Sequence, residues 1–248
     1  MNVFWSDMTH RPLVVAACLV SFVAGRAIAA DNPAAARPED PALNKQLEEI
    51  DGRGAKIKDF TSDFRQEKFT ALLKKPLVSS GMVRVSGPVI RWDTRDPEAQ
   101  VLYSDGKEVR MYYPSQKLLE IYAIDQRLGD LASSPLPRLK TLREHFTLEK
   151  SDGKRFHPPT DRQVLPLRLV PREEALRQHV DEVDVLLDVT AAHILELEIV
   201  DADGDRTHVT FSGFKIDTGV TPDDLKLTVP AGTTVSRPLD GKRESPGR

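Results

Sequence analysis

The sequence predicts a mainly β fold dominated by one large antiparallel sheet. In about ten segments between residues 58 and 229, apolar residues recur at every second position with polar residues between them, which is the pattern of strands with one covered face and one wet face. Turn signals such as Asp105-Gly106 and Asp203-Gly204 separate the segments, because Asp-Gly favours tight hairpins. A sheet with this many strands has to curl or close.

The first half of the sheet follows Phe60 and Phe64, which begin the alternation, and is interrupted by Pro88. Each later segment contributes apolar residues two positions apart, which places them on one face of their strand. These residues are Val83 and Val85, Ile90 and Trp92, Val101 and Tyr103, Val109, Met111 and Tyr113, and Leu119 and Ile121.

The second half of the sheet shows the same alternation in shorter runs. A change of phase beside Gly213, between Phe211 and Phe214, predicts a β-bulge, because one extra residue reverses which positions face the core. The alternating residues are Leu165, Leu167 and Leu169, Val183, Val185, Leu187 and Val189, Leu195, Leu197 and Ile199, and, in a last strand that closes the sheet, Leu225, Leu227 and Val229.

Two segments have the spacing of helices. Leu43, Leu47 and Ile50 form one apolar stripe in a helix expected over about Asp40 to Ile50. Residues 128–146 lose the strand alternation and carry a second stripe, with a short helical turn and a helix that starts near Pro137. The apolar residues of this segment are Leu131, Leu136, Leu139, Leu142 and Phe146, and the spacing of the last three forms the stripe. This segment interrupts a run of strands, which is where a lid inserted into a sheet would lie.

The ends of the chain are expected to lie outside the fold. Residues 1–30 read as a signal peptide with an apolar stretch and a small-residue cleavage site near Ala29. An alternative is a lipid anchor at Cys18, although the apolar stretch before Cys18 is short for it. We expect a disordered leader over 31–41, one domain over 42–239 and a flexible tail over 240–248.

The composition and motifs argue against several classes of function. The chain has 35 Lys and Arg against 38 Asp and Glu, without a basic stripe, so nucleic acid is not an expected partner. No nucleophile elbow, zinc helix or phosphate loop is present, and we expect no enzymatic activity and no cofactor. The histidines lack metal-ligand spacing, and we expect them on the surface or in loops. Asp201-Ala202-Asp203-Gly204-Asp205 resembles a calcium loop but lacks its Gly and Glu positions, which favours a hairpin turn.

The residues alone leave open whether the apolar sheet face is a packed core or the wall of a ligand cavity, since both produce the same alternation. The order of features between Ser80 and Tyr122 favours the ligand cavity over the packed core. Gly81 opens a strand and Pro88 follows it, and the next strand ends in Trp92. Ser-Asp-Gly-Lys at 104–107 then precedes a Tyr-rich strand. This order resembles the LolA family of periplasmic lipoprotein carriers.

The resemblance implies an open half β-barrel covered by an N-terminal helix and an inserted helical lid. It further implies a monomeric periplasmic carrier that binds the acyl chains of lipoproteins and shuttles them from an inner-membrane donor complex to an outer-membrane receptor. The expected apolar cavity and lid consist of Trp92, Val101 (or its neighbour Leu102), Met111, Tyr113, Leu119, Ile121, Leu136, Leu139, Leu142, Val185, Leu197 and Phe211.

One position departs from the family pattern. LolA-like proteins usually carry an Arg directly before this Pro, and that Arg holds the lid closed, whereas this chain has Gly87 before Pro88. Arg91 is a possible substitute, but strand alternation places it on the face opposite Trp92. The departure keeps two alternatives open: a LolA-like carrier of another lipid or glycolipid, and a periplasmic lipid-sensing or scaffold domain.

Overall fold

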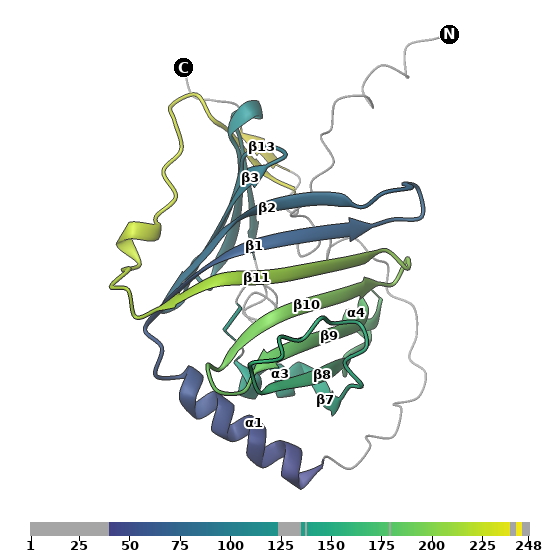
Figure 1. The fold of residues 1–248 in the computed structure, drawn as a ribbon. Helices are drawn as coiled ribbons and strands as arrows, with labels where there is room; N and C mark the ends of the chain where they lie inside the picture. Colours follow the sequence, from purple (N-terminus) through teal and green to yellow (C-terminus); the bar gives the residue numbers. More distant parts are fainter. Residues whose placement is uncertain (1–39, 124–134, 137, 179, 239–241, 245–248) are drawn as a thin grey trace.

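One curled sheet of thirteen strands forms the protein (Figure 1). The computed structural model describes residues 40–123, 135–136, 138–178, 180–238 and 242–244. The spatial order of the strands is β13-β12-β6-β5-β4-β3-β2-β1-β11-β10-β9-β8-β7. The bounds are β1 (Asp59–Phe69), β2 (Leu77–Ser86), β3 (Val89–Asp96), β4 (Gln100–Ser104), β5 (Glu108–Tyr113), β6 (Leu118–Ala123), β7 (Phe146–Lys150), β8 (Val164–Pro171), β9 (Val180–Asp188), β10 (His193–Asp201), β11 (Arg206–Ile216), β12 (Thr234–Arg237) and β13 (Lys242–Glu244).

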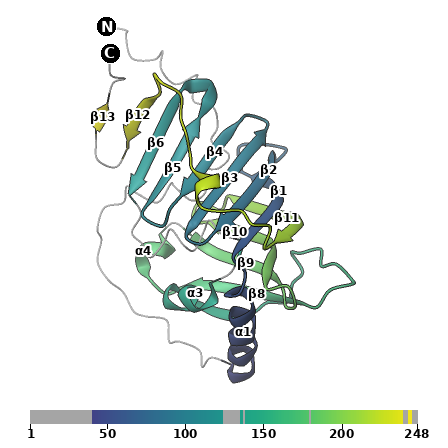
Figure 2. The same ribbon diagram turned by 90° about the vertical axis from the view of Figure 1, so that its left-hand side faces the viewer.

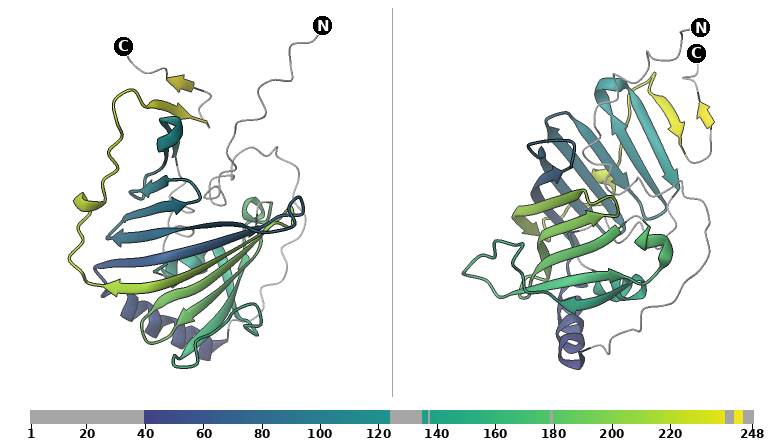
Figure 3. Two further views of the ribbon diagram at one scale, coloured as in Figure 1. Left: turned by 45° about the horizontal axis from the view of Figure 1, so that its top comes forward. Right: turned by 90° about the vertical axis from the view of Figure 1, so that its right-hand side faces the viewer.

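The sheet is an open half-barrel, as the resemblance implied. Neighbouring strands are antiparallel except β12, which pairs in parallel with β6. The sheet bends so that β3 to β6 form one wall and β7 to β10 form the other, with β1, β2 and β11 between them (Figure 2). The edge strands β7 and β13 do not meet, so the barrel stays unclosed (Figure 3). Within the described residues, no helix is long and apolar enough to cross a membrane.

Two of the register shifts in the sheet lie beside a glycine. In β11 the chain has φ +64° at Gly213, and two residues oppose one residue of β1, which confirms the bulge predicted from the change of phase. Opposite Gly81 of β2, strand β3 carries one extra residue, Arg95, and a Cβ atom on Gly81 would lie 2.0 Å from the carbonyl oxygen of Asp93. Only glycine permits this approach of β3 to β2, and bulges of this kind increase local bending of a sheet.

Two helices cover the β7-to-β11 side of the concave face. Helix α1 (Pro41–Gly54) begins at the N-cap Asp40, whose carboxylate accepts a hydrogen bond from the Ala42 amide at 2.9 Å. Its predicted stripe of Leu43, Leu47 and Ile50 is fully buried, although the helix continues beyond the predicted end at Ile50. Helix α3 (Leu139–His145) lies within the predicted lid and starts two residues after the predicted start near Pro137. Phe146, predicted as the end of this helix, is instead the first residue of β7, and residues 135–136 are not helical. Residues 128–134 and Pro137 of the predicted segment lie outside the described residues.

Asp51 joins the two helices. Its carboxylate accepts hydrogen bonds from the backbone amides of Leu139 and Lys140, each at 2.8 Å, and so caps the first turn of α3. Burial raises the pKa of Asp51, although these two bonds and the nearby Arg143 oppose the shift. The Arg143 guanidinium also donates to the Asn44 carbonyl at 3.2 Å. The two helices therefore pack as one unit against the sheet.

The C-terminal segment differs from its prediction. Leu225, Leu227 and Val229 do not form a closing strand; η3 (Asp223–Leu225) and an irregular segment carry them over the convex face of the β3-to-β6 wall. Their alternation reflects burial of an extended segment against that face, because side chains of any extended chain alternate. Two further short helices, α4 (Glu174–Arg177) and η2 (Pro114–Gln116), lie in connections. Residues 242–244 of the predicted tail form β13, while residues 1–39, with the predicted signal peptide and Cys18, lie outside the described residues.

Three histidines differ from the expectation that they lie on the surface or in loops, whereas His157 is exposed in a loop as expected. His145 and His193 are buried, and His145 Nδ1 lies 2.8 Å from a Glu173 carboxylate oxygen. His208 lies between two glutamates on the convex face, with Nε2 3.1 Å from Glu196 and Nδ1 3.4 Å from Glu198. These positions show that the scattered spacing of histidines does not indicate exposure.

Candidate functional site

The concave face of the sheet carries a continuous apolar surface centred on Trp92. The indole packs between Phe64 and Phe211, with ring centroids 4.7 and 5.7 Å apart. Strand register places Trp92 beside Leu102 and Leu102 beside Met111, so the three side chains share one face. Trp92 contacts both the main core under the helices and a second cluster on β4 to β6. It therefore connects the two halves of the concave face.

Nine of the twelve predicted site residues lie on this surface or in the helical segment that covers it. Val185, Leu197, Phe211, Leu136, Leu139 and Leu142 belong to the main core, Met111 and Tyr113 belong to the β4-to-β6 cluster, and Trp92 joins the two. The structure therefore brings the residues of one predicted wall together, although Leu139 and Leu142 lie deep in the core, with exposed fractions of 1% and 6%.

The other three predicted wall residues, Val101, Leu119 and Ile121, lie on the opposite face. Val101 pairs with Tyr112, which pairs with Leu119, and all of these residues pack on the convex side beneath Leu227 and Val229. The placement of these three on the concave wall is corrected to the neighbouring positions Leu102, Leu118 and Tyr122. The error has a physical cause: the C-terminal segment covers the convex side, so β4 to β6 are apolar on both faces and alternation alone does not identify the inner one.

Polar groups also lie on the concave side of β5 and β6. Glu120 is directly opposite Met111, and its carboxylate accepts a hydrogen bond from the Tyr122 hydroxyl at 2.8 Å. Burial and the neighbouring Glu120 carboxylate both raise the pKa of Tyr113, which therefore stays a neutral hydrogen-bond donor. Sequence analysis missed Glu120, because a charged residue between apolar ones reads as a solvent-facing position. The apolar wall therefore has one polar corner.

The region of the missing family Arg is held by different contacts. Gly87 has φ +56°, a left-handed conformation that favours glycine in the turn between β2 and β3. Its carbonyl oxygen accepts a hydrogen bond from Arg138, the residue before α3, at 3.3 Å. A hydrogen bond therefore joins the β2–β3 turn to the helical segment, but its Arg belongs to the helical segment and not to the turn.

Arg91 does not replace the missing Arg. Its guanidinium binds Asp93 at 2.8 Å and donates to the carbonyl oxygens of Leu225 and Lys226 at 3.3 and 3.0 Å. These partners lie on the convex side, as strand alternation predicted, and Arg91 holds the C-terminal segment on the sheet. Besides the Arg138 side-chain bond, a backbone bond from the Ile194 amide to the Pro135 carbonyl at 2.8 Å ties the segment before α3 to β10.

A separate cavity of about 450 Å³ lies outside the apolar wall. It is bounded by residues 161–163, by the turn between β9 and β10, and by Phe214 and Ile216 of the β11 bulge. Charged and polar groups, among them Asp161, Arg162 and Asp188, make up much of its lining, which suits an acyl chain poorly. Among the described residues, no group of His, Cys, Asp and Glu has the arrangement of a metal site.

Comparison with known proteins agrees with this geometry. Residues 55–228 match the model of the family described as outer membrane lipoprotein carrier protein LolA. The chain belongs to the LolA family, because the match covers well over half of its length.

Individual relatives are distant. The outer-membrane lipoprotein carrier protein of Pseudomonas putida KT2440 is 26% identical over 165 residues, covering 63% of this chain and 71% of that protein. The protein of the same name from Xanthomonas oryzae pv. oryzae is 28% identical over 232 residues, covering 91% and 97%. Among solved structures, the LolA superfamily protein NE2245 from Nitrosomonas europaea is 13% identical with a TM-score of 0.42, covering 75% of this chain and 97% of that one.

Proposed function

We propose that this protein is a periplasmic carrier that binds the acyl chains of lipoproteins on the concave face around Trp92 and shuttles them from the inner to the outer membrane. In this proposal an inner-membrane complex donates the lipoprotein and an outer-membrane receptor accepts it. The protein binds and releases its cargo as a monomer, without catalysis and without a cofactor. Export by the N-terminal segment, with cleavage near Ala29, brings it to the periplasm.

The observation that carries the proposal is the apolar concave surface from Phe211 through Trp92 and Leu102 to Met111. An acyl chain is recognised without directional bonds, and each methylene removed from water contributes about 0.8 kcal/mol. A surface of large side chains on a curled sheet supplies that environment, and family membership supplies the class of cargo.

Extraction of a lipoprotein from membranes tests the proposal. The protein is incubated with inner-membrane vesicles that hold a radiolabelled triacylated lipoprotein, and the soluble fraction is analysed for a lipoprotein complex. Wild-type protein is expected to release the lipoprotein in soluble form. Absence of a soluble complex, in the presence of the donor machinery of the same membranes, would contradict the carrier function.

Two half-buried residues provide a matched pair of variants for this assay. Leu118 belongs to the concave cluster of β4 to β6 and Val101 belongs to the convex cluster. We expect Leu118→Glu to reduce the soluble complex by at least about tenfold, since an unpaired carboxylate in an apolar site costs more than 1.4 kcal/mol. Val101→Glu is expected to leave extraction close to wild type. Equal effects of the two substitutions would place the cargo elsewhere.

A carrier of another lipid or a glycolipid is the second candidate. It is favoured by Glu120 with its Tyr122 partner in the concave wall, because these groups suit a cargo whose polar end carries hydrogen-bond donors. The extraction assay separates the two: a labelled lipid without lipoprotein in the soluble fraction supports this candidate. If neither cargo is extracted, the remaining interpretation is a lipid-sensing or scaffold domain.

A further inference from the structure

The β1–β2 hairpin exposes three large apolar side chains, two in its loop and one, Val78, near the start of β2. Leu72 is 93% exposed, Leu73 43% and Val78 41%. Only two other large apolar residues of the described chain, Val170 and Ile216, are classed as exposed, and both lie on other strands. Single exposed apolar residues are common on protein surfaces, but a group at one projecting tip marks an interaction site.

The backbone displays these residues in a defined way. The Leu73 amide donates to the Thr70 carbonyl at 3.2 Å, and the Leu72 amide donates to the Thr70 hydroxyl at 3.3 Å. At the base of the loop, the Arg206 guanidinium lies 4.5 Å from the ring centroid of Phe69. The loop is therefore a turn with local hydrogen bonds and an anchored base. Its outward leucines are held by that turn.

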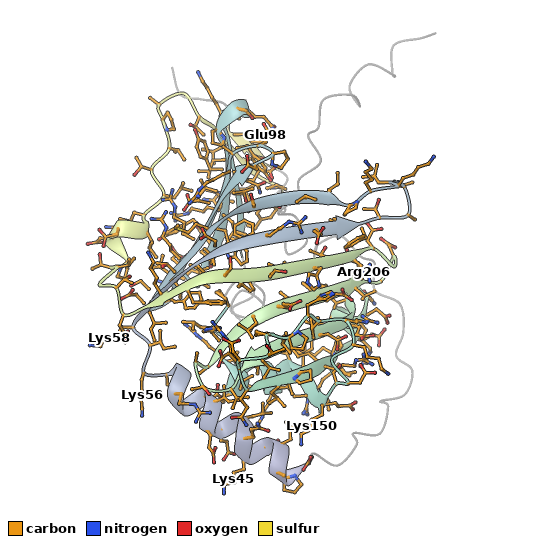
Figure 4. All side chains as sticks on the ribbon, in the orientation of Figure 1. Lys45, Lys56, Lys58, Glu98, Lys150 and Arg206 are labelled. Carbon is orange, nitrogen blue, oxygen red and sulfur yellow. The ribbon has the colours of Figure 1, made fainter. Side chains whose placement is uncertain are left out.

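The charge of the loop is positive. Lys74 and Lys75 follow the leucines directly and are exposed, and residues 70–76 contain no acidic residue. Below the loop, the acidic Glu67 of β1 pairs with Arg65 at 2.6 Å, and Asp201 and Asp205 of the β10–β11 turn lie 3.9 and 3.7 Å from the Lys68 ammonium. Phe69 pairs with Arg206, the first residue of β11, so the loop continues beyond this acidic turn (Figures 1 and 4). The tip presents leucines and lysines together although the whole chain has a net charge of −3.

We infer that the β1–β2 hairpin docks on the surface of an anionic lipid bilayer, with Leu72 and Leu73 inserted at the level of the headgroups and Lys74 and Lys75 beside the lipid phosphates. Apolar side chains next to lysines are the combination that binds such an interface. The free energy of burying the apolar side chains adds to that of attracting the lysines to anionic lipids. A contact made by two leucines and two lysines is weak and reversible, which suits a protein that returns to solution. The inference does not depend on the proposed cargo, because the empty protein is expected to dock.

Sedimentation with vesicles tests the inference. The protein purified from the periplasm of an expression host is mixed with vesicles of phosphatidylethanolamine and phosphatidylglycerol, or with vesicles of phosphatidylcholine alone. We expect wild-type protein to sediment with the anionic vesicles and much less with phosphatidylcholine. The Leu72→Ser/Leu73→Ser variant should lose at least about tenfold in partitioning, because full burial of one leucine side chain changes a partition coefficient roughly ten- to hundredfold. Lys74→Glu/Lys75→Glu should remove the preference for anionic vesicles.

Val170→Ser is the matched control, because Val170 is 39% exposed on β8, away from the hairpin. It should sediment like wild type, and all variants should melt at the wild-type temperature. Unchanged sedimentation of the Leu72→Ser/Leu73→Ser variant, or no sedimentation of wild-type protein, would overturn the inference. Concentration-dependent dimerisation that these substitutions abolish, without vesicle binding, would also overturn it and assign the hairpin to contact with a second copy of the chain.

Discussion

Replacement of Leu139 by Ala tests whether α3 is part of the packed core or a lid that opens freely. Leu139 is 1% exposed and packs in the cluster that contains Leu47, Ile50 and Phe146. Deletion of a buried leucine side chain removes its transfer free energy and leaves a cavity, which together cost about 2–5 kcal/mol. The upper part of the range applies if the capped first turn of α3 prevents the helix from collapsing into the space.

Urea unfolding measures this cost. The midpoint and slope of the transition are compared between wild type and Leu139→Ala, since an unchanged slope allows the two free energies of unfolding to be subtracted. Leu72→Ala is the control, because Leu72 is 93% exposed and its truncation should change the free energy of unfolding by less than about 0.5 kcal/mol. A loss below about 1 kcal/mol for Leu139→Ala would refute the packing argument and show that α3 leaves the sheet at little cost.

Three further substitutions test the contacts that hold the half-barrel. Asp51→Ala should lower the free energy of unfolding by about 1 kcal/mol, as loss of a helix cap does, and native-state hydrogen exchange should speed up first in α3; equal exchange would contradict the capping role. Gly81→Ala should cost at least about 2 kcal/mol in urea unfolding, because its Cβ would lie 2.0 Å from the Asp93 carbonyl oxygen, whereas Gly52→Ala, with no atom within 4 Å, should not destabilise. The hydrogen bond to Glu196 and the charge of Glu198 raise the pKa of His208, so its contribution to stability is complete below the unfolded-state value of about 6.5 and is lost as pH rises through the folded-state value. The stability difference between wild type and His208→Gln should therefore shrink from about pH 6 to pH 9, and a difference that grows would be inconsistent with this pairing.

Much of the fold could be predicted because it depends on local patterns. Alternation identified most of the strands, Asp105-Gly106 and Asp203-Gly204 marked true turns, and the change of phase beside Gly213 marked a true bulge. The stripe of α1 was also correct, since an amphipathic helix has a period that differs from that of a strand.

The concave wall could be predicted only in part, because the face of a strand that is covered depends on distant segments. Trp92 and Met111 were assigned correctly, but Leu119 was placed inside although the C-terminal segment buries it outside. No local signal shows that residues 225–229 cross the convex face. The same limit applies to Arg138, whose bond to the Gly87 carbonyl joins residues far apart in the chain.

Photo-cross-linking from two adjacent tyrosines tests the central claim most directly. Tyr113 lies in the concave cluster and Tyr112 in the convex cluster, and their exposed fractions are nearly equal at 8% and 7%. Each is replaced in turn by p-benzoylphenylalanine, a photoreactive aromatic residue, and the protein is irradiated in complex with an acylated lipoprotein. We predict a cross-link to the acyl chains from position 113 and none from position 112. A cross-link from position 112 without one from position 113 would contradict binding on the concave face.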